Sequence, residues 1–410
     1  MNRTVLDIRF PSHVSMAPLI APENAWPLWA VMIVGVAICI YLEQTRKWAA
    51  KTSGPILALI GGMLLSNGKI LPIAAPSYDL VEDYLVPVAI PLLLFRANLV
   101  KIVRETGSMF LCFHVASLGT VLGAFLAALL FRGSFPRVPE VTGVMTGSYI
   151  GGGVNFVAIK NSYNVSADLT NPLLVADNFI MAGMFAVLFV ISASRFFLSR
   201  FAHPHTHDSN SDRVQELAAR YWQRKEIALL DIAKALAIAF AVAAVSMLLT
   251  RAIKSRIESK IIQSIFGNPY VLVTFFIVVV TTVFHRSMER IQGSEELGMY
   301  LLYLFFFVIG LRADLWQVVL NVPVLFGFCT VIAVTNLLVT LAVGKLLRLN
   351  LEELLLSVNA TLGGAPSAAA MAISKGWSNL VLPGLLAGIW GYVIGTFVGI
   401  VIAEALLRML

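Results

Sequence analysis

Long apolar runs fill this chain, and most of them approach the 20 or so residues that a helix needs to cross a lipid bilayer. Hydrophobic residues make up 58% of the 410 positions and charged residues only 13%, against roughly 25% charged in an ordinary soluble domain. The sequence therefore predicts an all-α, polytopic protein of the cell inner (plasma) membrane, with the lipid bilayer as its partner. The candidate segments are 26–42, 54–73, 81–102, 108–131, 141–160, 170–198, 227–250, 270–285, 295–311, 318–347, 353–374 and 379–406.

The segments form two groups around a polar centre, and the groups resemble each other. Asp79–Leu99 aligns without a gap on Glu295–Leu315, so that Arg96-Ala-Asn-Leu matches Arg312-Ala-Asp-Leu. Weak internal symmetry of this kind is common in secondary transporters. We therefore predict two repeats, with the divisions 1–25 (N-terminal extension), 26–198 (first repeat), 199–226 (polar linker) and 227–410 (second repeat).

One apolar segment in each repeat contains a glycine-rich stretch, Gly147–Asn155 in the first and Thr361–Ser367 in the second. If each stretch is the tip of a re-entrant hairpin, the chain has ten spanning helices and two hairpins, and the repeats are inverted. If each is a broken helix that crosses, there are twelve crossings and the repeats point the same way. We favour inverted repeats of about five helices plus a hairpin, because such repeats are a common transporter plan and glycine suits a tight tip.

The basic residues predict orientation rather than a nucleic-acid partner. The net charge is +7, but the Lys and Arg residues sit in short connections, where they set topology. The linker, with Arg200, Arg213, Arg220, Arg224 and Lys225, is therefore expected in the cytoplasm. The basic stretch 251–260 would then face out, which conflicts with the rule unless that stretch is an amphipathic helix on the membrane surface.

No pattern in the sequence indicates an enzyme. Cys39, Cys112 and Cys329 have neither metal-ligand nor disulfide spacing. A phosphate-cradling GxxxxGK[ST] motif is missing. We expect no catalytic residues, no bound metal and no cofactor beyond a coupling ion.

Opened backbone inside a membrane protein can bind a substrate, because its freed N–H and C=O groups find no partner in lipid. The alternative interpretation is close helix packing by small residues. The predicted substrate-binding residues, which are the tip glycines and the neutral polar residues near them, are Ser148, Gly151, Gly152, Gly153, Asn155, Asn359, Thr361, Gly363, Gly364 and Ser367.

Charged residues near these segments suggest two further roles. Asp177 lies inside an apolar segment, where a bare charge costs at least ~2.5 kcal/mol, so we predict that it binds the coupling ion with Asn178. An interfacial or helix-capping Asp is the alternative. Arg96 and Arg312 end their segments and are possible contacts for an anion, although snorkelling to the interface also explains them.

These features together predict an ion-coupled secondary transporter, an Na⁺ or H⁺ symporter of a small organic anion, amino acid or short peptide that works by alternating access. A cation/proton antiporter of similar fold is the alternative.

Parts of the sequence also resemble known families. Ala17-Pro-Leu-Ile-Ala-Pro-Glu, Pro91-Leu-Leu-Leu-Phe-Arg-Ala-Asn-Leu and Thr361-Leu-Gly-Gly-Ala-Pro-Ser resemble the YjcL-like DUF819 family of bacterial membrane proteins. More distantly, the paired Gly-Gly stretches are similar to those of glutamate:sodium symporters and 2-hydroxycarboxylate transporters. That resemblance implies cation-coupled transport, tips that line the site, and a possible homodimer. The chain lacks the Gly-His-Gly or Gly-Asn-Gly continuation of those families, so dicarboxylate specificity is not implied.

Overall fold

The computed structural model describes residues 18–46, 54–205, 226–313 and 315–410, and within these ranges every regular element is helical. The all-α prediction is therefore confirmed. The elements are α1 (Ala25–Thr45), α3 (Gly54–Asn67), α4 (Pro76–Leu80), η1 (Val81–Leu85), α5 (Val86–Leu93), α6 (Leu99–Glu105), α7 (Ser108–Leu130), α8 (Val138–Ser162), α9 (Ala167–Ala193), α10 (Arg195–Leu198), α12 (Leu229–Arg256), α13 (Lys260–Ile265), α14 (Pro269–Val283), α15 (His285–Met288), α16 (Ser294–Leu311), α17 (Leu315–Leu346), α18 (Leu351–Ser374), η2 (Ser378–Leu380) and α19 (Val381–Met409).

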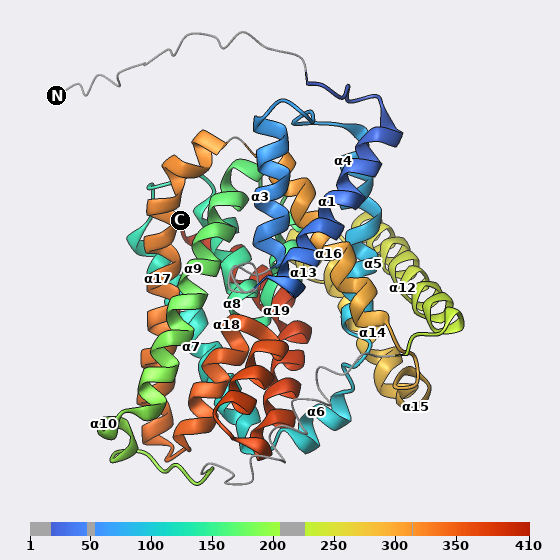
Figure 1. The fold of residues 1–410 in the computed structure, drawn as a ribbon. Coiled ribbons are helices and arrows are strands. Elements are labelled where there is room, and N and C mark those ends of the chain that lie inside the picture. Colours follow the sequence, from blue (N-terminus) through green and yellow to red (C-terminus); the bar gives the residue numbers. More distant parts are fainter. Residues whose placement is uncertain (1–17, 47–53, 206–225, 314) are drawn as a thin grey trace, which may run out of the picture.

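The helices pack as two bundles, which lie beside each other in Figure 1. In the first, which we call the hairpin bundle, α19 packs on α8 and α18, and α17 packs on α7 and α9. In the second, the flanking bundle, α3 packs on α1 and α16, and α12 packs on α5 and α14.

The first glycine segment, α8, is folded back on itself. Arg137, which precedes α8, donates hydrogen bonds to the carbonyl oxygens of Tyr163 and Asn164, which follow it, at 2.6 and 2.9 Å. A straight helix of 25 residues would hold these ends about 37 Å apart. The chain reverses at Gly151 and Gly152, and Gly152 has φ 66° and ψ −169°, a conformation that residues with a Cβ rarely adopt. The segment is therefore a helical hairpin.

The second glycine segment, α18, has the same form. Asn359 Nδ2 lies 3.0 Å from Sδ of Met371, which is 12 residues further along, whereas a straight helix would separate them by about 18 Å. The reversal occurs at Gly364, with φ 77° and ψ −172°. Both glycine segments thus have the geometry of hairpins, and neither continues as a broken but straight helix.

The aligned segments of the two halves run in opposite directions. Arg312, just after α16, bonds to Asp79 of α4 at 2.5 Å, whereas Arg96, just after α5, donates to Gln292, just before α16, at 3.2 Å. The beginning of each segment thus lies at the end of the other. The division into two inverted repeats stays a prediction, which this antiparallel pairing supports.

A chain of buried polar side chains connects the two hairpins. Asn336 of α17 donates to the Thr120 hydroxyl of α7 at 2.8 Å and to the Thr361 hydroxyl of α18 at 3.1 Å. Thr120 in turn donates to the Tyr149 carbonyl of α8 at 3.0 Å. Thr120 and Asn336 occupy matching positions in the alignment of the two halves. Hydrogen bonds between helices in lipid average ~0.6 kcal/mol, so this chain fixes the relative positions of the hairpins more than it stabilises the fold.

One prediction about local structure needs correction. The predicted segment 81–102 is divided, because α5 ends at Leu93 and the Asn98 side chain caps a separate helix, α6. Within the predicted N-terminal extension, the backbone N–H groups of Leu19 and Ile20 donate to the carbonyls of Lys69 and Ile70, just after α3. Residues 1–17 and most of the predicted linker lie outside the described residues.

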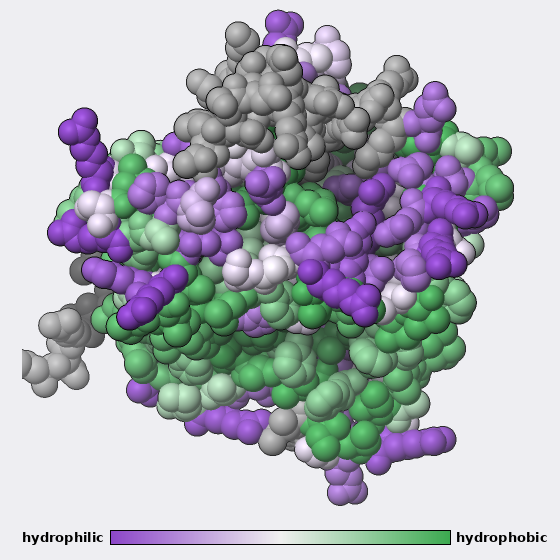
Figure 2. Space-filling model, turned by 90° about the horizontal axis from the view of Figure 1, so that it is seen from below, coloured by the Kyte–Doolittle hydropathy of each residue, from purple (hydrophilic) through white to green (hydrophobic). Residues whose placement is uncertain are grey.

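Eight helices of the described residues are long and apolar enough to cross a membrane, and α18 is among them although it is a hairpin. The apolar helices α3 and α14 are shorter. Figure 2 shows the end of the molecule with α6, α10 and α15, where hydrophilic residues gather beside apolar surface. Basic residues in the connections at this end, which favour the cytoplasm, include Arg96, Lys101, Arg104, Arg195, Arg200, Arg286 and Arg290.

The hairpin geometry predicts that both ends of α8 face one side of the membrane and both ends of α18 face the other. Single cysteines at Arg137 and Asn164 should react with an impermeant maleimide from the same side, and cysteines at Asn350 and Lys375 only from the opposite side. The native cysteines are buried and give a low background. Labelling of positions 137 and 164 from opposite sides would contradict the hairpin.

Candidate functional site

The tips of the two hairpins lie against one aromatic side chain. A Cβ placed on Gly152 would lie 3.5 Å from Cε1 of Tyr392, and a Cβ placed on Gly364 would lie 2.8 Å from its hydroxyl oxygen. Tyr392 belongs to α19, inside the hairpin bundle, and is half-buried. The structure therefore brings together two stretches of opened backbone that are far apart in the sequence.

Glycine packing explains how α19 comes so close to the first hairpin. Gly143, Gly147 and Gly151 recur every four residues on α8, and they face Gly399, Gly395 and Gly391 of α19. A Cβ on Gly147 would lie 3.2 Å from the Gly395 carbonyl oxygen, and a Cβ on Gly151 would overlap the Gly391 carbonyl oxygen. Small residues at such spacing let helix backbones touch. Gly151 thus serves helix packing as well as the first reversal, whereas only Gly152 and Gly364 need a positive φ at the reversals.

Asp177 lies beside the first hairpin and is 8% exposed. Its Oδ2 accepts a hydrogen bond of 3.1 Å from Ser148, and the buried Tyr149 phenol lies beside the carboxyl group as a second potential donor. The carboxyl group comes from α9, and Ser148 lies three residues before the first tip glycine. The predicted coupling-ion residue is therefore next to the predicted substrate stretch, with one oxygen available to a proton or a cation.

Asn155 holds the first hairpin in shape rather than offering a free amide. Its Nδ2 donates to the carbonyl of Gly151 at 2.9 Å and to that of Gly391 at 3.3 Å, while its Oδ1 accepts from Thr396 at 2.6 Å. The side chain thereby satisfies carbonyls that the helix break leaves open, and it ties the hairpin to α19.

The polar residues of the second hairpin bond mainly within the hairpin. Thr361 and Ser367 donate to the carbonyls of Val358 and Gly364 at 2.9 Å each. Asn359 donates to Met371, but its buried Oδ1 lacks a hydrogen-bond partner among the described residues. Of this set, Asn359 keeps an oxygen that could coordinate a ligand.

The remaining predicted residues at the tips have apolar or local neighbours. A Cβ on Gly153 would lie 3.5 Å from Cζ of Phe306, and one on Gly363 would overlap the Phe185 ring of α9. Asn178 donates to the Leu174 carbonyl of its own helix at 2.8 Å. The proposed role of Asn178 as an ion ligand stays a prediction.

The two arginines contact different surroundings. Arg312 forms ion pairs with Asp79 at 2.5 Å and with Glu82 at 3.5 Å, so acids already balance its charge. Arg96 bonds to the neutral amide of Gln292 and lines a cavity between the bundles. Of the two, Arg96 therefore has the surroundings that suit an anion.

Sequence reasoning missed two features of this region. Tyr392 lies within the apolar segment 379–406 with no sequence signal of its own, and its contact with both tips depends on the packing of α19. Lys160, 6% exposed, forms an ion pair of 2.8 Å with Glu82 across the two bundles. A lysine inside an apolar segment was the available signal, since lipid-exposed charges are rare there.

Comparisons with known proteins give a family. Residues 30–409 match the family model described as "Protein of unknown function (DUF819)". The chain is 44% identical over 385 residues to the "Uncharacterized membrane protein YjcL" of Bacillus subtilis (strain 168), covering 94% of this chain and 97% of that protein. The chain is a multi-pass membrane protein, as the sequence predicted.

Replacing Gly364 by alanine should damage the second hairpin. The substitution forces a Cβ into the left-handed region at φ 77° and places it 2.8 Å from the Tyr392 hydroxyl, so we expect a loss of at least ~1 kcal/mol of stability. Thermal unfolding of the purified protein measures this loss of stability. Gly183→Ala on α9 is the control, because no atom lies within 4 Å of its added Cβ. Equal melting temperatures for the two variants would refute the strained tip.

Proposed function

Since the chain belongs to the DUF819 family, whose function is unknown, we propose from its geometry that it is an ion-coupled secondary transporter of a small organic solute. The observation that carries this proposal is the meeting of two glycine-broken hairpins at Tyr392, beside the buried carboxyl group of Asp177. Opened backbone at membrane depth is tolerated only inside protein or beside a watery cavity. Transporters use such backbone to bind substrates and coupling ions.

The arrangement of the two halves supports inverted repeats. α5 and α16 are antiparallel, as their terminal arginine contacts require, and their sequences align. The ends of α6 and α7 also match those of α17, because Leu99 aligns with Leu315 and Leu130 with Leu346. Two hairpins that enter from opposite faces would then be re-entrant and would meet near the middle of the bilayer.

Asp177 is the natural carrier of the coupling ion. An unpaired carboxylate inside the bilayer is unstable by at least ~2.5 kcal/mol, so the group must hold a proton or a cation. Ser148 and the neighbouring Tyr149 phenol can donate to the carboxylate, and its Oδ1 can still hold a proton or a cation. Since Ser148 connects Asp177 to the first hairpin, binding of the ion can bias the position of the tip.

Alternating access requires that the two bundles move relative to each other, and the contacts between them differ at the two ends. At the Arg312 end, Lys160 of the hairpin bundle and Glu82 of the flanking bundle pair at 2.8 Å, with side chains 8% and 16% exposed. Cavities border the interface at both ends: one of about 330 Å³ separates α19 from α5–α6 and α14–α15 at the Arg96 end, and one of about 450 Å³ lies between the end of α8 and α12–α14 near Lys160. The buried ion pair, which among the described residues joins the bundles at the Arg312 end only, supports a contact that must break when the bundles move.

Asp177→Asn should abolish coupling while preserving the fold. The amide retains an acceptor for Ser148 but cannot carry a proton or pair with a cation, so an imposed Na⁺ or pH gradient should no longer drive solute uptake. Proteoliposomes incubated with labelled carboxylates, amino acids and dipeptides provide the measurement. Asp168→Asn is the matched control, an exposed acid in the first turn of the same helix. Full gradient-driven uptake in Asp177→Asn would eliminate the coupling role, and proton efflux on adding Na⁺ without solute would favour the antiporter.

Breaking the Lys160–Glu82 pair should open the Arg312 end. Lys160→Gln removes a buried charge partner, a change that typically costs about 3–5 kcal/mol, and it weakens only the conformation in which the bundles touch there. A cysteine at Asn161 should then react several-fold faster with an impermeant maleimide. The charge-reversed double variant, Lys160→Glu with Glu82→Lys, should slow the reaction again, while a cysteine at exposed Arg132, in the loop after α7, should react equally in all backgrounds. Unchanged reactivity at position 161 would rule out the ion pair as a seal.

A further inference from the structure

The cavity between the bundles has a position that suits a substrate pathway. Residues of α5–α6 and α14–α15 form its wall on the flanking bundle, and the first turns of α19 form the opposite wall. Ile389 of α19 lines the cavity, and Tyr392, which lies against both hairpin tips, is three residues further along. One turn of helix, about 4.5 Å of rise, therefore separates the cavity lining from the tips.

The charges at the cavity favour an anion. Arg96 bonds to the neutral amide of Gln292, and no carboxylate among the described residues pairs with it. Lys101 pairs with Glu289 at 3.5 Å, but the side chains are 38% and 50% exposed, and such surface pairs are worth only about 0–1 kcal/mol. An entering carboxylate could therefore bind Arg96 and compete with Glu289 for Lys101.

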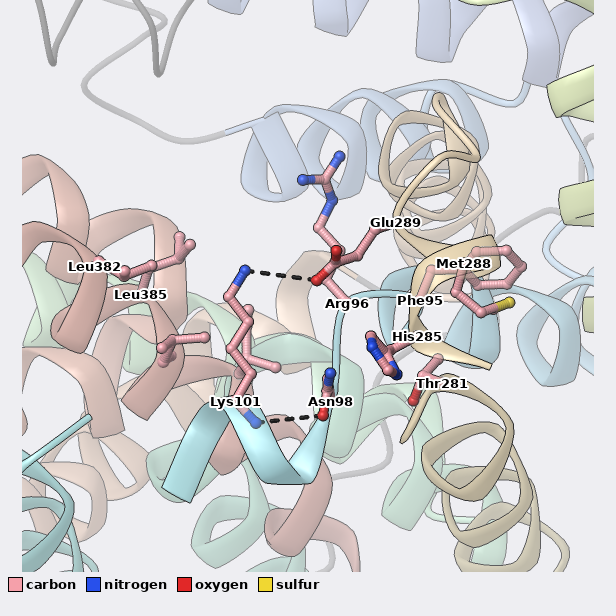
Figure 3. A pocket seen from close by; sticks show the side chains of 12 residues that line it. Phe95, Arg96, Asn98, Lys101, Thr281, His285, Met288, Glu289, Leu382 and Leu385 are labelled. Carbon is pink, nitrogen blue, oxygen red and sulfur yellow. Dashed lines mark hydrogen bonds and ion pairs between the residues drawn. The ribbon is translucent and has the colours of Figure 1, made fainter. Parts of the chain in front are cut away.

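Most of the remaining wall is apolar, and Asn98, Thr281 and His285 are its polar members. In Figure 3, Leu382 and Leu385 lie on one side of the cavity and Met288 on the other, with Lys101 and Arg96 between them. A volume of about 330 Å³ is at the small end of the range for ligand pockets. The single lining acid, Glu289, is already paired with Lys101, so a substrate ammonium group would have no carboxylate of its own.

We infer that this cavity is the inner substrate site and that it takes small anions with one carboxylate and an apolar body. Arg96 binds the carboxylate, and the leucines of α19 cover the apolar part. This inference rests on the proposed transport function, whose solute class it names, and it disfavours amino acids and peptides, which carry an ammonium group.

Binding to the purified full chain tests the site without requiring transport. The probe is phenylacetate, compared by isothermal titration with phenethylamine, which has the same ring and the opposite charge. Phenylacetate should bind the wild type and phenethylamine should not. Arg96→Gln should weaken phenylacetate binding at least tenfold, Arg96→Lys less, and Lys254→Gln not at all, since Lys254 lines a separate groove near α13.

Three outcomes would overturn the inference: no phenylacetate binding to the wild type, equal binding of phenethylamine, or unchanged binding in Arg96→Gln. Uptake into proteoliposomes separates this failure from failure of the transport proposal. Gradient-driven uptake of another solute that is insensitive to Arg96→Gln would preserve the transporter and eliminate the site. Phenylacetate binding through Arg96 without any uptake would preserve the site and eliminate the transporter.

Discussion

A membrane interior gives no hydrogen-bond partner to an open backbone, and this constraint governs the arrangement of the helices around α8 and α18. Each hairpin interrupts its helix at a glycine with positive φ, Gly152 or Gly364, and thereby leaves backbone groups unpaired near its tip. The surrounding helices meet this need. α19 lies close enough for Asn155 to bond to the Gly391 carbonyl as well as to that of Gly151, and the polar chain through Thr120 and Asn336 reaches both hairpins.

The two halves are alike in their framework and different in their chemistry. Thr120 and Asn336 take matching positions and bond to each other, so the pseudo-symmetry passes through the middle of the hairpin bundle. Asp177 and Tyr392, in contrast, lie on the corresponding helices α9 and α19 but contribute an acid on one side and a phenol on the other. A symmetric framework with one carboxyl group gives a single ion-binding candidate, next to the first hairpin.

The contacts between the two bundles are also unequal. Polar contacts join them where Lys160 meets Glu82 and where Asn171 of α9 donates to the Ile309 carbonyl of α16 at 3.0 Å. A buried ion pair requires a specific geometry, and breaking it leaves a buried charge without a partner, so the pair selects one arrangement of the bundles. At the other end, apolar side chains and exposed charges border a cavity. Separating the bundles at that end therefore breaks no buried ion pair of the described residues.

The sequence alone determined the helical membrane fold, the two aligned halves, the position of the helix breaks and Asp177 as an intramembrane acid. These features follow from local chemistry: hydrophobic length, glycine conformation and the energetic cost of charge in lipid. Only the tertiary structure decided that α8 and α18 fold back, that Tyr392 lies against both tips, and that Asn155 and Arg312 have partners while Arg96 faces a cavity. Those outcomes depend on contacts between residues up to hundreds of positions apart, and neither composition nor spacing records which distant partner a side chain meets.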